Sequence, residues 1–468
     1  MNIRNKIVFV TILLLLNVLP VIVQAKQSNI IFMLSDDQSW SGLSFRMNPD
    51  DKNSMSIYDE TPNLKILASE GTRFTNAYAP SPVCSPSRAS IQTGKSPARL
   101  NWTKAAPFYT SNDKLYLIPP NHSKDLSKSE ITIGEMLKQA NYKTAHFGKW
   151  HLLGGGPKKH GYDVSDGNIG NKYASKFVDP NPVDLFGMIE RAERFIDISQ
   201  NENKPFYIQL SFHALHYPEN ALKDTILKYN KKFKKDLKTR EINRLAINEN
   251  MDSAIGRLIK YLKNKNLYEN TFLIFMADNG AYNRFSSLKG GKGALWEGGI
   301  RVPFIIKGPT IPMNAVNNVP IIGYDLFPTL MHISGLENSN ADLDGINIFD
   351  TFKDTFISEE RPTKGLIFHF PHYQNNQKPA SAIIMNNWKL IKSYEKKVDL
   401  LFNLKKDPSE KINLINEEKL LYKKLLDELE KYLFSVNASY PKKNPKFDAN
   451  ALVKSSKKIK MKKKKKKK

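Results

Sequence analysis

The sequence contains a single cysteine, and the residues around it indicate chemistry at this position. Cys84 opens the string Cys-Ser-Pro-Ser-Arg-Ala-Ser-Ile-Gln-Thr-Gly, and one cysteine cannot form a disulfide within the chain. Pro86 suits the first turn of a helix, where backbone N–H groups and the helix dipole attract an anion. Arg88 lies in the same turn and can reach back to a bound oxygen. A lone cysteine is either buried and inert or chemically special, and this string places it beside a predicted anion-binding site.

Two acidic or amide pairs supply hard oxygen donors. Asp36 and Asp37 follow one apolar run, and Asp278 and Asn279 follow another. Either pair alone is weak evidence, because an aspartate at a strand end often caps a helix. Three carboxylates and an amide, without Cys or His among them, suit Ca²⁺ or Mg²⁺ better than zinc.

The cysteine string resembles the signature of the formylglycine-dependent sulfatases, in which the Cys of Cys-x-Pro-x-Arg is oxidised to formylglycine. The similarity extends from Asn29 to about Leu433 and includes the stretch 407–414. It implies an alkaline phosphatase-like fold. It also implies that residue 84, together with the four donors above, holds a metal ion, with Ca²⁺ favoured over Mg²⁺.

The resemblance assigns further roles to the segment Gly148-Lys149-Trp150-His151. Lys149 would bind a sulfate oxygen, and His151 would act on the formylglycine hydroxyl. Two residues depart from the family pattern. Asn141 stands where the family usually has Gly, which is acceptable because Asn tolerates a left-handed helix cap. Phe147 replaces a small residue, and the sequence offers no reason for it.

Two more segments complete the predicted catalytic set. In Ser-Phe-His-Ala-Leu-His-Tyr-Pro, the resemblance selects His216 as the substrate-side histidine and leaves His213 as its neighbour. In Gly-Lys-Gly-Ala-Leu-Trp-Glu-Gly-Gly it selects Lys292 as the last catalytic lysine, whereas Lys289 is not selected. His216 or Lys292 would protonate the departing alcohol.

The implied function is hydrolysis of a sulfate ester on a sulfated saccharide, after a formylglycine-generating enzyme has converted Cys84. A formylglycine-dependent phosphodiesterase or phosphonate hydrolase is the rival enzyme, and a non-catalytic polyanion-binding protein is a rival of another class. The choice of sugar depends on the segments 41–59, 102–128 and 154–179, which carry no readable pattern. The segment 368–373, rich in aromatic residues and His, resembles substrate-rim segments but can equally be packing.

Alternating helices and apolar runs must position these residues. Apolar strand-like runs at 29–34, 144–147, 206–210 and 271–276 alternate with helical patterns at 61–69, 131–140, 185–198 and 241–263. This order predicts an α/β fold with a large, mostly parallel sheet sandwiched by helices. Ligands of such sheets bind beyond the carboxyl ends of the strands, where the polar residues lie.

The pattern changes near residue 345. Strand-like segments at 380–391 and 398–403, separated by a charged turn at 395–397, precede an amphipathic helix at 417–433. They predict a smaller antiparallel sheet with one helix. We therefore divide the chain into a signal peptide (1–25), a catalytic α/β domain (26–345), a C-terminal α+β subdomain (346–440) and a disordered basic tail (441–468).

Both ends of the chain bear on location and partners. Arg4 and Lys6 precede an apolar stretch that is short for a membrane anchor, and Val23-Gln-Ala25 resembles a cleavage site. This predicts a periplasmic or secreted protein without a stable membrane anchor. Of the net charge of +25, the tail from residue 441 contributes 14 lysines against one aspartate. Such a tail binds polyanions weakly at most, and no nucleic-acid-binding motif accompanies it.

Overall fold

The computed structural model describes residues 27–105, 114–282, 286–337, 342–353, 359–374, 377–395 and 398–448. The predicted signal peptide and the part of the basic tail beyond residue 448 lie outside these ranges. Within them, no helix combines the length and the apolar character needed to cross a bilayer.

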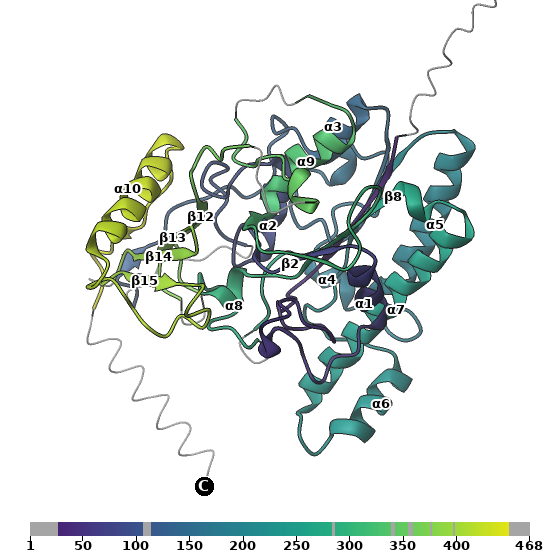
Figure 1. Ribbon diagram of the computed structural model, residues 1–468, viewed down its shortest axis with the longest axis horizontal. Helices are drawn as coiled ribbons and strands as arrows, with labels where there is room; N and C mark the ends of the chain where they lie inside the picture. The colour runs from purple at the N-terminus through teal and green to yellow at the C-terminus, as the bar shows by residue number, and fades with distance from the viewer. Residues whose placement is uncertain are drawn as a thin grey trace, which may run out of the picture.

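An eight-stranded sheet runs through the centre of the molecule (Figure 1). Its strands in spatial order are β10 (Ala315–Asn317), β2 (Thr72–Phe74), β9 (Phe304–Lys307), β8 (Thr271–Ala277), β1 (Asn29–Ser35), β7 (Phe206–Ser211), β5 (Lys143–Gly148) and β6 (Val164–Ser165). The strands from β8 to β6 are mutually parallel, whereas β9 is antiparallel to both of its neighbours. The predicted mostly parallel sheet is confirmed.

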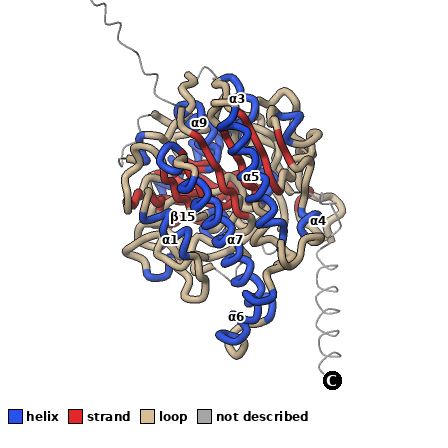
Figure 2. Tube along the Cα trace, turned by 90° about the vertical axis from the view of Figure 1, so that its right-hand side faces the viewer, coloured by secondary structure: helices blue, strands red, loops and turns tan. Residues whose placement is uncertain are grey.

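Helices cover both faces of this sheet. Side chains alternate along β1, so that Ile31 and Met33 join one hydrophobic core and Phe32 and Leu34 the other. The first core is completed by α1 (Pro62–Ser69), α5 (Leu185–Asn201) and α7 (Thr239–Asn264); the second by α2 (Cys84–Thr93), α3 (Ile133–Gln139) and α9 (Leu326–Ile333). Figure 2 shows α5 and α7 in front of the strands.

The predicted helices at 131–140, 185–198 and 241–263 are confirmed as α3, α5 and α7. A reciprocal capping box between Thr132 and Glu135 starts α3. Just after α3, Asn141 has a φ of 63°, which explains an Asn where the family has Gly. Phe147 is buried on β5 with its ring 6.4 Å from that of Phe195 on α5, so its bulk belongs to the core.

A second sheet is antiparallel and contains β12 (Leu366–Phe370), β13 (Ala380–Met385), β14 (Trp388–Ser393) and β15 (Leu400–Asn403), with α10 (Lys419–Ser435) packed on one side. The small sheet with one helix is thus confirmed. The single strand expected at 380–391 is wrong, because Asn386 and Asn387 take φ values of 50° and 65° and turn the chain into a hairpin. The domain boundaries at 345 and 440 stay predictions.

Short elements complete the described chain. They are β3 (Ala77–Tyr78) paired with β11 (Ile321–Ile322), β4 (Leu117–Ile118) paired with β16 (Lys442–Lys443), the helices α4 (Asn171–Ala174), α6 (Lys223–Phe233) and α8 (Glu297–Ile300), and the 3₁₀ turns η1 (Lys52–Ser54), η2 (Pro157–His160), η3 (Pro182–Asp184), η4 (Tyr268–Asn270), η6 (Gly323–Asp325) and η7 (Asp350–Phe352).

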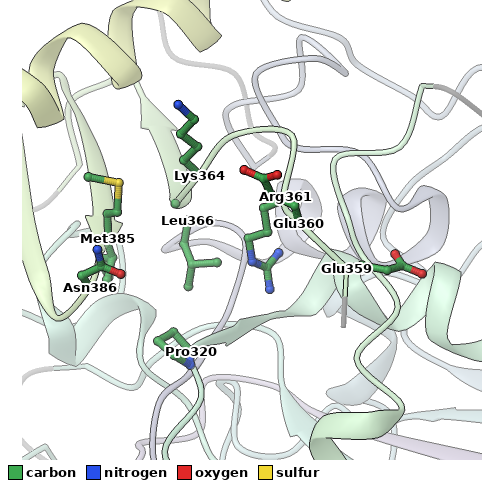
Figure 3. Close-up of a pocket in the computed structure, with 10 residues that line it drawn as sticks. Pro320, Glu359, Glu360, Arg361, Lys364, Leu366, Met385 and Asn386 are labelled. Carbon is green, nitrogen blue, oxygen red and sulfur yellow. The ribbon is translucent and has the colours of Figure 1, made fainter. Parts of the chain in front are cut away.

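A surface hollow of about 450 Å³ lies beside the start of β12 and the β13–β14 turn (Figure 3). Its one arginine, Arg361, is already held by Asp325 through bonds of 2.7 and 2.5 Å. Lys364 on its rim pairs with Glu428 at 3.5 Å. These charges are satisfied within the protein, and the hollow shares no lining residue with the predicted site.

Candidate active site

Most of the predicted site residues follow the carboxyl ends of four neighbouring strands, β8, β1, β7 and β5, whereas Cys84 and Arg88 lie on α2. The register sets these ends level, because Ser35 lies opposite Ala277, and both Leu34 and Gly148 lie opposite Ser211. Carboxyl ends of adjacent parallel strands meet at one edge of a sheet. Four segments that are far apart in sequence therefore deliver their next residues to one place.

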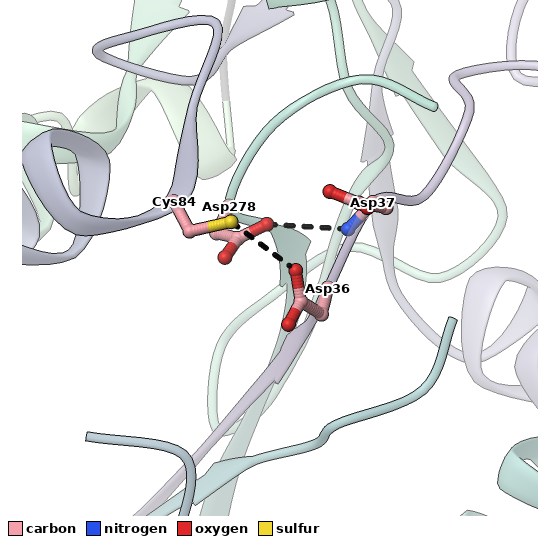
Figure 4. A group of neighbouring side chains, drawn as sticks. All are labelled: Asp36, Asp37, Cys84 and Asp278. Carbon is pink, nitrogen blue, oxygen red and sulfur yellow. Dashed lines mark hydrogen bonds between the residues drawn. The ribbon is translucent and has the colours of Figure 1, made fainter. Parts of the chain in front are cut away.

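Four buried side chains form the acidic part of the site (Figure 4). The donor atoms of Asp36, Asp37, Asp278 and Cys84 all lie within 4.8 Å of one another. Cys84 Sγ donates to Asp36 Oδ1 at 3.5 Å, and the backbone N–H of Asp37 donates to Asp278 Oδ1 at 3.3 Å. Such a set of converging oxygens can hold a divalent cation.

The amide of Asn279 tests whether a cation fits this set. Its Nδ2 donates to Asp37 Oδ1 at 2.7 Å and to the Gly280 carbonyl at 3.0 Å. Its Oδ1 is buried and has no hydrogen-bond partner. An unsatisfied buried acceptor costs about 1–3 kcal/mol, so native proteins rarely leave one without a purpose. An unused amide oxygen beside three carboxylates fits a hard cation.

Two cationic side chains, those of Arg88 and Lys149, form ion pairs with these carboxylates. Arg88 donates from Nε to Asp278 Oδ2 at 2.8 Å and from Nη1 to the Lys149 carbonyl at 2.6 Å. The ammonium group of Lys149 pairs directly with Asp36 Oδ2, and both side chains are fully buried. Gly148 precedes this lysine with a φ of 87°, and a Cβ there would lie 2.2 Å from the Ser211 carbonyl oxygen. Glycine is therefore required where β5 delivers Lys149.

Lys292 supplies the third cation from the segment after β8. Its Nζ lies 2.8 Å from Asp37 Oδ2 and 3.3 Å from Cys84 Sγ. Lys289 instead donates to the Glu410 carbonyl at 2.7 Å, away from the cysteine. The choice of Lys292 over Lys289 agrees with this placement.

We call these seven residues the buried centre: Asp36, Asp37, Cys84, Arg88, Lys149, Asp278 and Lys292. The three carboxylates and three cations balance in formal charge. One added divalent cation would leave an excess of two positive charges, which suits an anionic substrate.

Burial and neighbouring charges shift the pKa values here. Burial, with help from Asp36, raises the pKa of the Cys84 thiol to about 12, so the unmodified side chain is protonated. Burial would also raise the pKa of Asp36, but Lys149 and other nearby cations hold it well below the usual value. Burial lowers the pKa of His151 far below its usual value, and Lys149 adds to this, so His151 is neutral and can accept a proton.

The predicted histidines lie at the margin of the buried centre. Nδ1 of His151 lies 3.2 Å from Ser85 Oγ on the first turn of α2. His216 is half-buried and donates from Nδ1 to the Tyr217 carbonyl at 2.6 Å, and it is close enough to help lower the pKa of Asp36. His213 is buried, and burial lowers its pKa to about 3. The partly exposed His216 is thus better placed to meet a substrate.

An aromatic rim beside the site was not predicted from the sequence. The Lys292 ammonium lies 5.7 Å from the ring centre of Tyr282, which is 42% exposed. The Arg240 guanidinium lies between this ring and that of Tyr217, at 5.9 and 5.7 Å. In the sequence, the signal for this rim was that Tyr217 directly follows His216, a predicted site residue. Exposed rings of this kind offer flat apolar faces to a ligand.

Comparison with known proteins identifies the class. The chain belongs to the sulfatase family, since the family described as Sulfatase matches residues 28–336, and that described as N-sulphoglucosamine sulphohydrolase, C-terminal, matches residues 291–439. The fold is that of alkaline phosphatase-like sulfatases. The chain is accordingly a sulfuric ester hydrolase.

Individual relatives agree with this class. A sulfatase of Formosa agariphila is 27% identical and aligns with 84% of this chain and 85% of its own. The N-acetylgalactosamine-6-sulfatase of Sus scrofa is 28% identical and aligns with 73% of this chain and 68% of its own. The crystal structure of Ps i-CgsB has a TM-score of 0.72 at 25% identity and covers 87% of this chain and 93% of its own.

Proposed function

We propose that this chain removes sulfate from a sulfated carbohydrate, with formylglycine formed at Cys84 as the nucleophile and Ca²⁺ as the bound metal. One observation carries the proposal. The side chain of Cys84 stands where Asp36, Asp37 and Asp278 converge and where the Lys292 ammonium lies 3.3 Å away. A nucleophile at this point meets both a cation site and a fixed positive charge.

The residues at this site fit both Ca²⁺ and a formylglycine at position 84. Three carboxylates and the unpartnered Oδ1 of Asn279 are hard oxygen donors, which favour Ca²⁺ over transition metals. Bound Ca²⁺ would draw electron density from the sulfate and make its sulfur more electrophilic. Oxidation of Cys84 to formylglycine would supply a hydrated aldehyde, which can expel sulfate in a second step and regenerate itself.

The lysines would bind and orient the sulfate group. Lys149 and Lys292 carry fixed ammonium groups that are bound to Asp36 and Asp37 respectively. Charges held in place before the substrate arrives stabilise developing negative charge without reorganisation. Arg88, fixed by Asp278, would hold the nucleophile in position.

The histidines would handle protons. His151, which is neutral in the folded protein, would accept a proton from the hydroxyl of residue 84. His216 or Lys292 would donate a proton to the departing alcohol. Because His216 faces the solvent side of the site, its side chain is the one that can meet the sugar.

Two observations support a sugar as the leaving group. The exposed rings of Tyr217 and Tyr282 lie beside His216 and Lys292 and can stack on a pyranose face. One relative is named for its action on N-acetylgalactosamine-6-sulfate groups. We further propose that a formylglycine-generating enzyme is a required partner and that the mature protein is periplasmic or secreted.

Turnover assays test the proposal. The protein is produced together with a formylglycine-generating enzyme, and sulfate release is measured from 4-nitrophenyl sulfate and from a panel of sulfated saccharides. We expect hydrolysis of sulfate esters in the presence of Ca²⁺ and much slower hydrolysis of phosphate mono- and diesters. Preferred hydrolysis of a phosphodiester or phosphonate, or binding of the saccharides without turnover, would contradict it.

A further inference from the structure

One buried lysine outside the buried centre has no carboxylate partner. Lys104 is 7% exposed, and its ammonium donates to Gln374 Oε1 and, at 3.4 Å, to the Tyr373 carbonyl. Among the described residues, no aspartate or glutamate pairs with it. Burial lowers its pKa to about 8. Holding a lysine this way costs stability, because a buried cation without an anion loses its hydration for little return.

The surroundings of Lys104 are basic as well. Its Nζ lies 5.2 Å from the ring centre of Phe370, and the ring of Phe370 lies 5.6 Å from that of His372. The rings of His122 and His372 lie 5.4 Å apart, and Lys104 contributes to lowering the pKa of both, after burial. His372 Nε2 bonds with Thr103 Oγ1 at 2.8 Å, while its buried Nδ1 has no partner. The cluster therefore contains a buried ring nitrogen without a hydrogen-bond partner, and no carboxylate among the described residues balances its positive charge.

This lysine is linked to the active site through one side chain. Gln374, which accepts from Lys104, packs so closely on Gly293 that a Cβ on that glycine would lie 2.7 Å from its Cγ. Gly293 directly follows Lys292, whose ammonium touches Cys84. Lys104 is thus connected through Gln374 to the segment that carries Lys292.

Other cations near the molecular surface are different. Arg361 in the hollow of Figure 3 is held by Asp325, and Lys95 pairs with Glu130 at 2.8 Å. In contrast, the described partners of the Lys104 ammonium are two neutral acceptors and the ring of Phe370. Among the described residues, no carboxylate balances its positive charge.

We propose that Lys104, positioned by Gln374, recognises a second anionic group on the substrate, next to the sulfate ester that is cleaved. The group is a carboxylate or a further sulfate on the same or the adjoining sugar. This inference rests on the proposed function. It narrows the substrate class from any sulfated saccharide to one with at least two anionic groups.

The test compares matched substrates on Lys104→Met and Lys104→Arg variants. One pair is a sulfated disaccharide with a uronate and its carboxyl-reduced form, and the other is a disulfated sugar and its monosulfated form. We expect Lys104→Met to lower kcat/KM at least tenfold on the doubly anionic member of one pair, with little change on its partner or on 4-nitrophenyl sulfate. The pair that responds identifies the anion, and Lys104→Arg should restore most of the loss.

Stability provides the second measurement. Because no described aspartate or glutamate pairs with Lys104, we expect Lys104→Met to unfold at the same temperature as the wild type or higher. Lys95→Met should leave both substrate preferences unchanged. Equal loss of kcat/KM on all substrates, or no loss on any, would overturn the role of Lys104 while leaving the sulfatase function intact. Absence of sulfate release by the wild type would instead refute the proposed function itself.

Discussion

Two clusters of buried charge in this molecule look alike and differ in what they can do. The first is the buried centre. The second joins α8 to the small sheet, where Lys389 Nζ lies 2.9 Å from Glu297 and 2.8 Å from Glu410. The hydroxyl of Tyr78 donates to Glu297 at 3.0 Å. All of these side chains are almost completely buried.

The difference lies in how the acceptors are used. In the Lys389 cluster, Glu297 and Glu410 face donors from neighbouring elements. Glu410 Oε2 accepts from the Glu297 backbone N–H at 2.8 Å, and Glu410 Oε1, which makes no hydrogen bond, is paired with the Lys389 ammonium at 2.8 Å. Its members hold segments of the chain together. In the buried centre, a cysteine stands among the charges and the amide oxygen of Asn279 has no partner. Burial and charge alone do not mark an active site, whereas converging oxygen acceptors around a nucleophile, one of them without a hydrogen-bond or ion-pair partner, do.

Removing the nucleophile should have the largest effect. We expect Cys84→Ala to lower kcat at least ~10³-fold, because no other side chain can take over the covalent step. In the metal-free protein the unfolding temperature should not fall, since the two hydrogen bonds of the Cys84 thiol are long, at 3.3 and 3.5 Å. Steady-state kinetics and thermal unfolding measure the two quantities. Retained turnover would show that the centre works without this residue.

The opposite result is expected in the Lys389 cluster. Lys389→Met removes the cation that two buried carboxylates share, and only Glu297 keeps another, Arg301 at 3.5 Å. The change should lower the free energy of unfolding by about 3–5 kcal/mol. The kcat per folded molecule should stay the same. Lys392→Met is the matched control, because this lysine lies on the same strand but forms a partly exposed pair with Glu430, worth about 0–1 kcal/mol. Equal destabilisation by both changes would contradict a structural role specific to Lys389.

Metal removal should affect one cluster only. Chelation should abolish sulfate release and lower the unfolding temperature. A free ion concentration of 100 times the Kd stabilises the folded state by about 2.7 kcal/mol, and chelation removes this contribution. Added Ca²⁺ should restore both sulfate release and the unfolding temperature, and added Mg²⁺ should restore less of each. In Asp278→Asn the stabilisation by Ca²⁺ should weaken, whereas in Lys389→Met it should persist. An unfolding temperature independent of Ca²⁺ would argue against the metal site.

The smallest expected effect is a pH dependence in the small sheet. Burial lowers the pKa of His369 to about 4, so the folded protein excludes a proton that the unfolded chain binds below about 6.5. Its contribution to stability is complete above that pH and is lost as the pH falls, by up to about 1.4 kcal/mol per pH unit. We expect denaturant titrations of His369→Gln at pH 7 and pH 5 to differ less than those of the wild type. An unchanged difference would assign the acid sensitivity to other groups.

The sequence predicted the parts of the molecule that depend on local pattern. Buried parallel strands read as continuous apolar runs, and the residues that follow them are fixed at one edge of the sheet, so Asp36 and Asp278 could be placed together in advance. The misses depend on context. The hairpin at Asn386 was missed because apolar residues continue on both sides of two asparagines that take positive φ.

Long-range partners could not be predicted for the same reason. Glu410 lies in a stretch that resembles the family, but its contact with Lys389 depends on how the small sheet meets α8. Lys104 is one of many lysines in the sequence, and its lack of a carboxylate partner becomes evident only when its neighbours in space are known.

Mass spectrometry of the peptide containing residue 84 is the most direct test of the central claim. The protein is produced with a formylglycine-generating enzyme, the peptide is analysed, and the converted fraction is compared with kcat in the same preparations. We expect a formylglycine mass at position 84, with kcat rising in proportion to the converted fraction. Full sulfatase activity in a preparation whose Cys84 is entirely an unmodified thiol would contradict it.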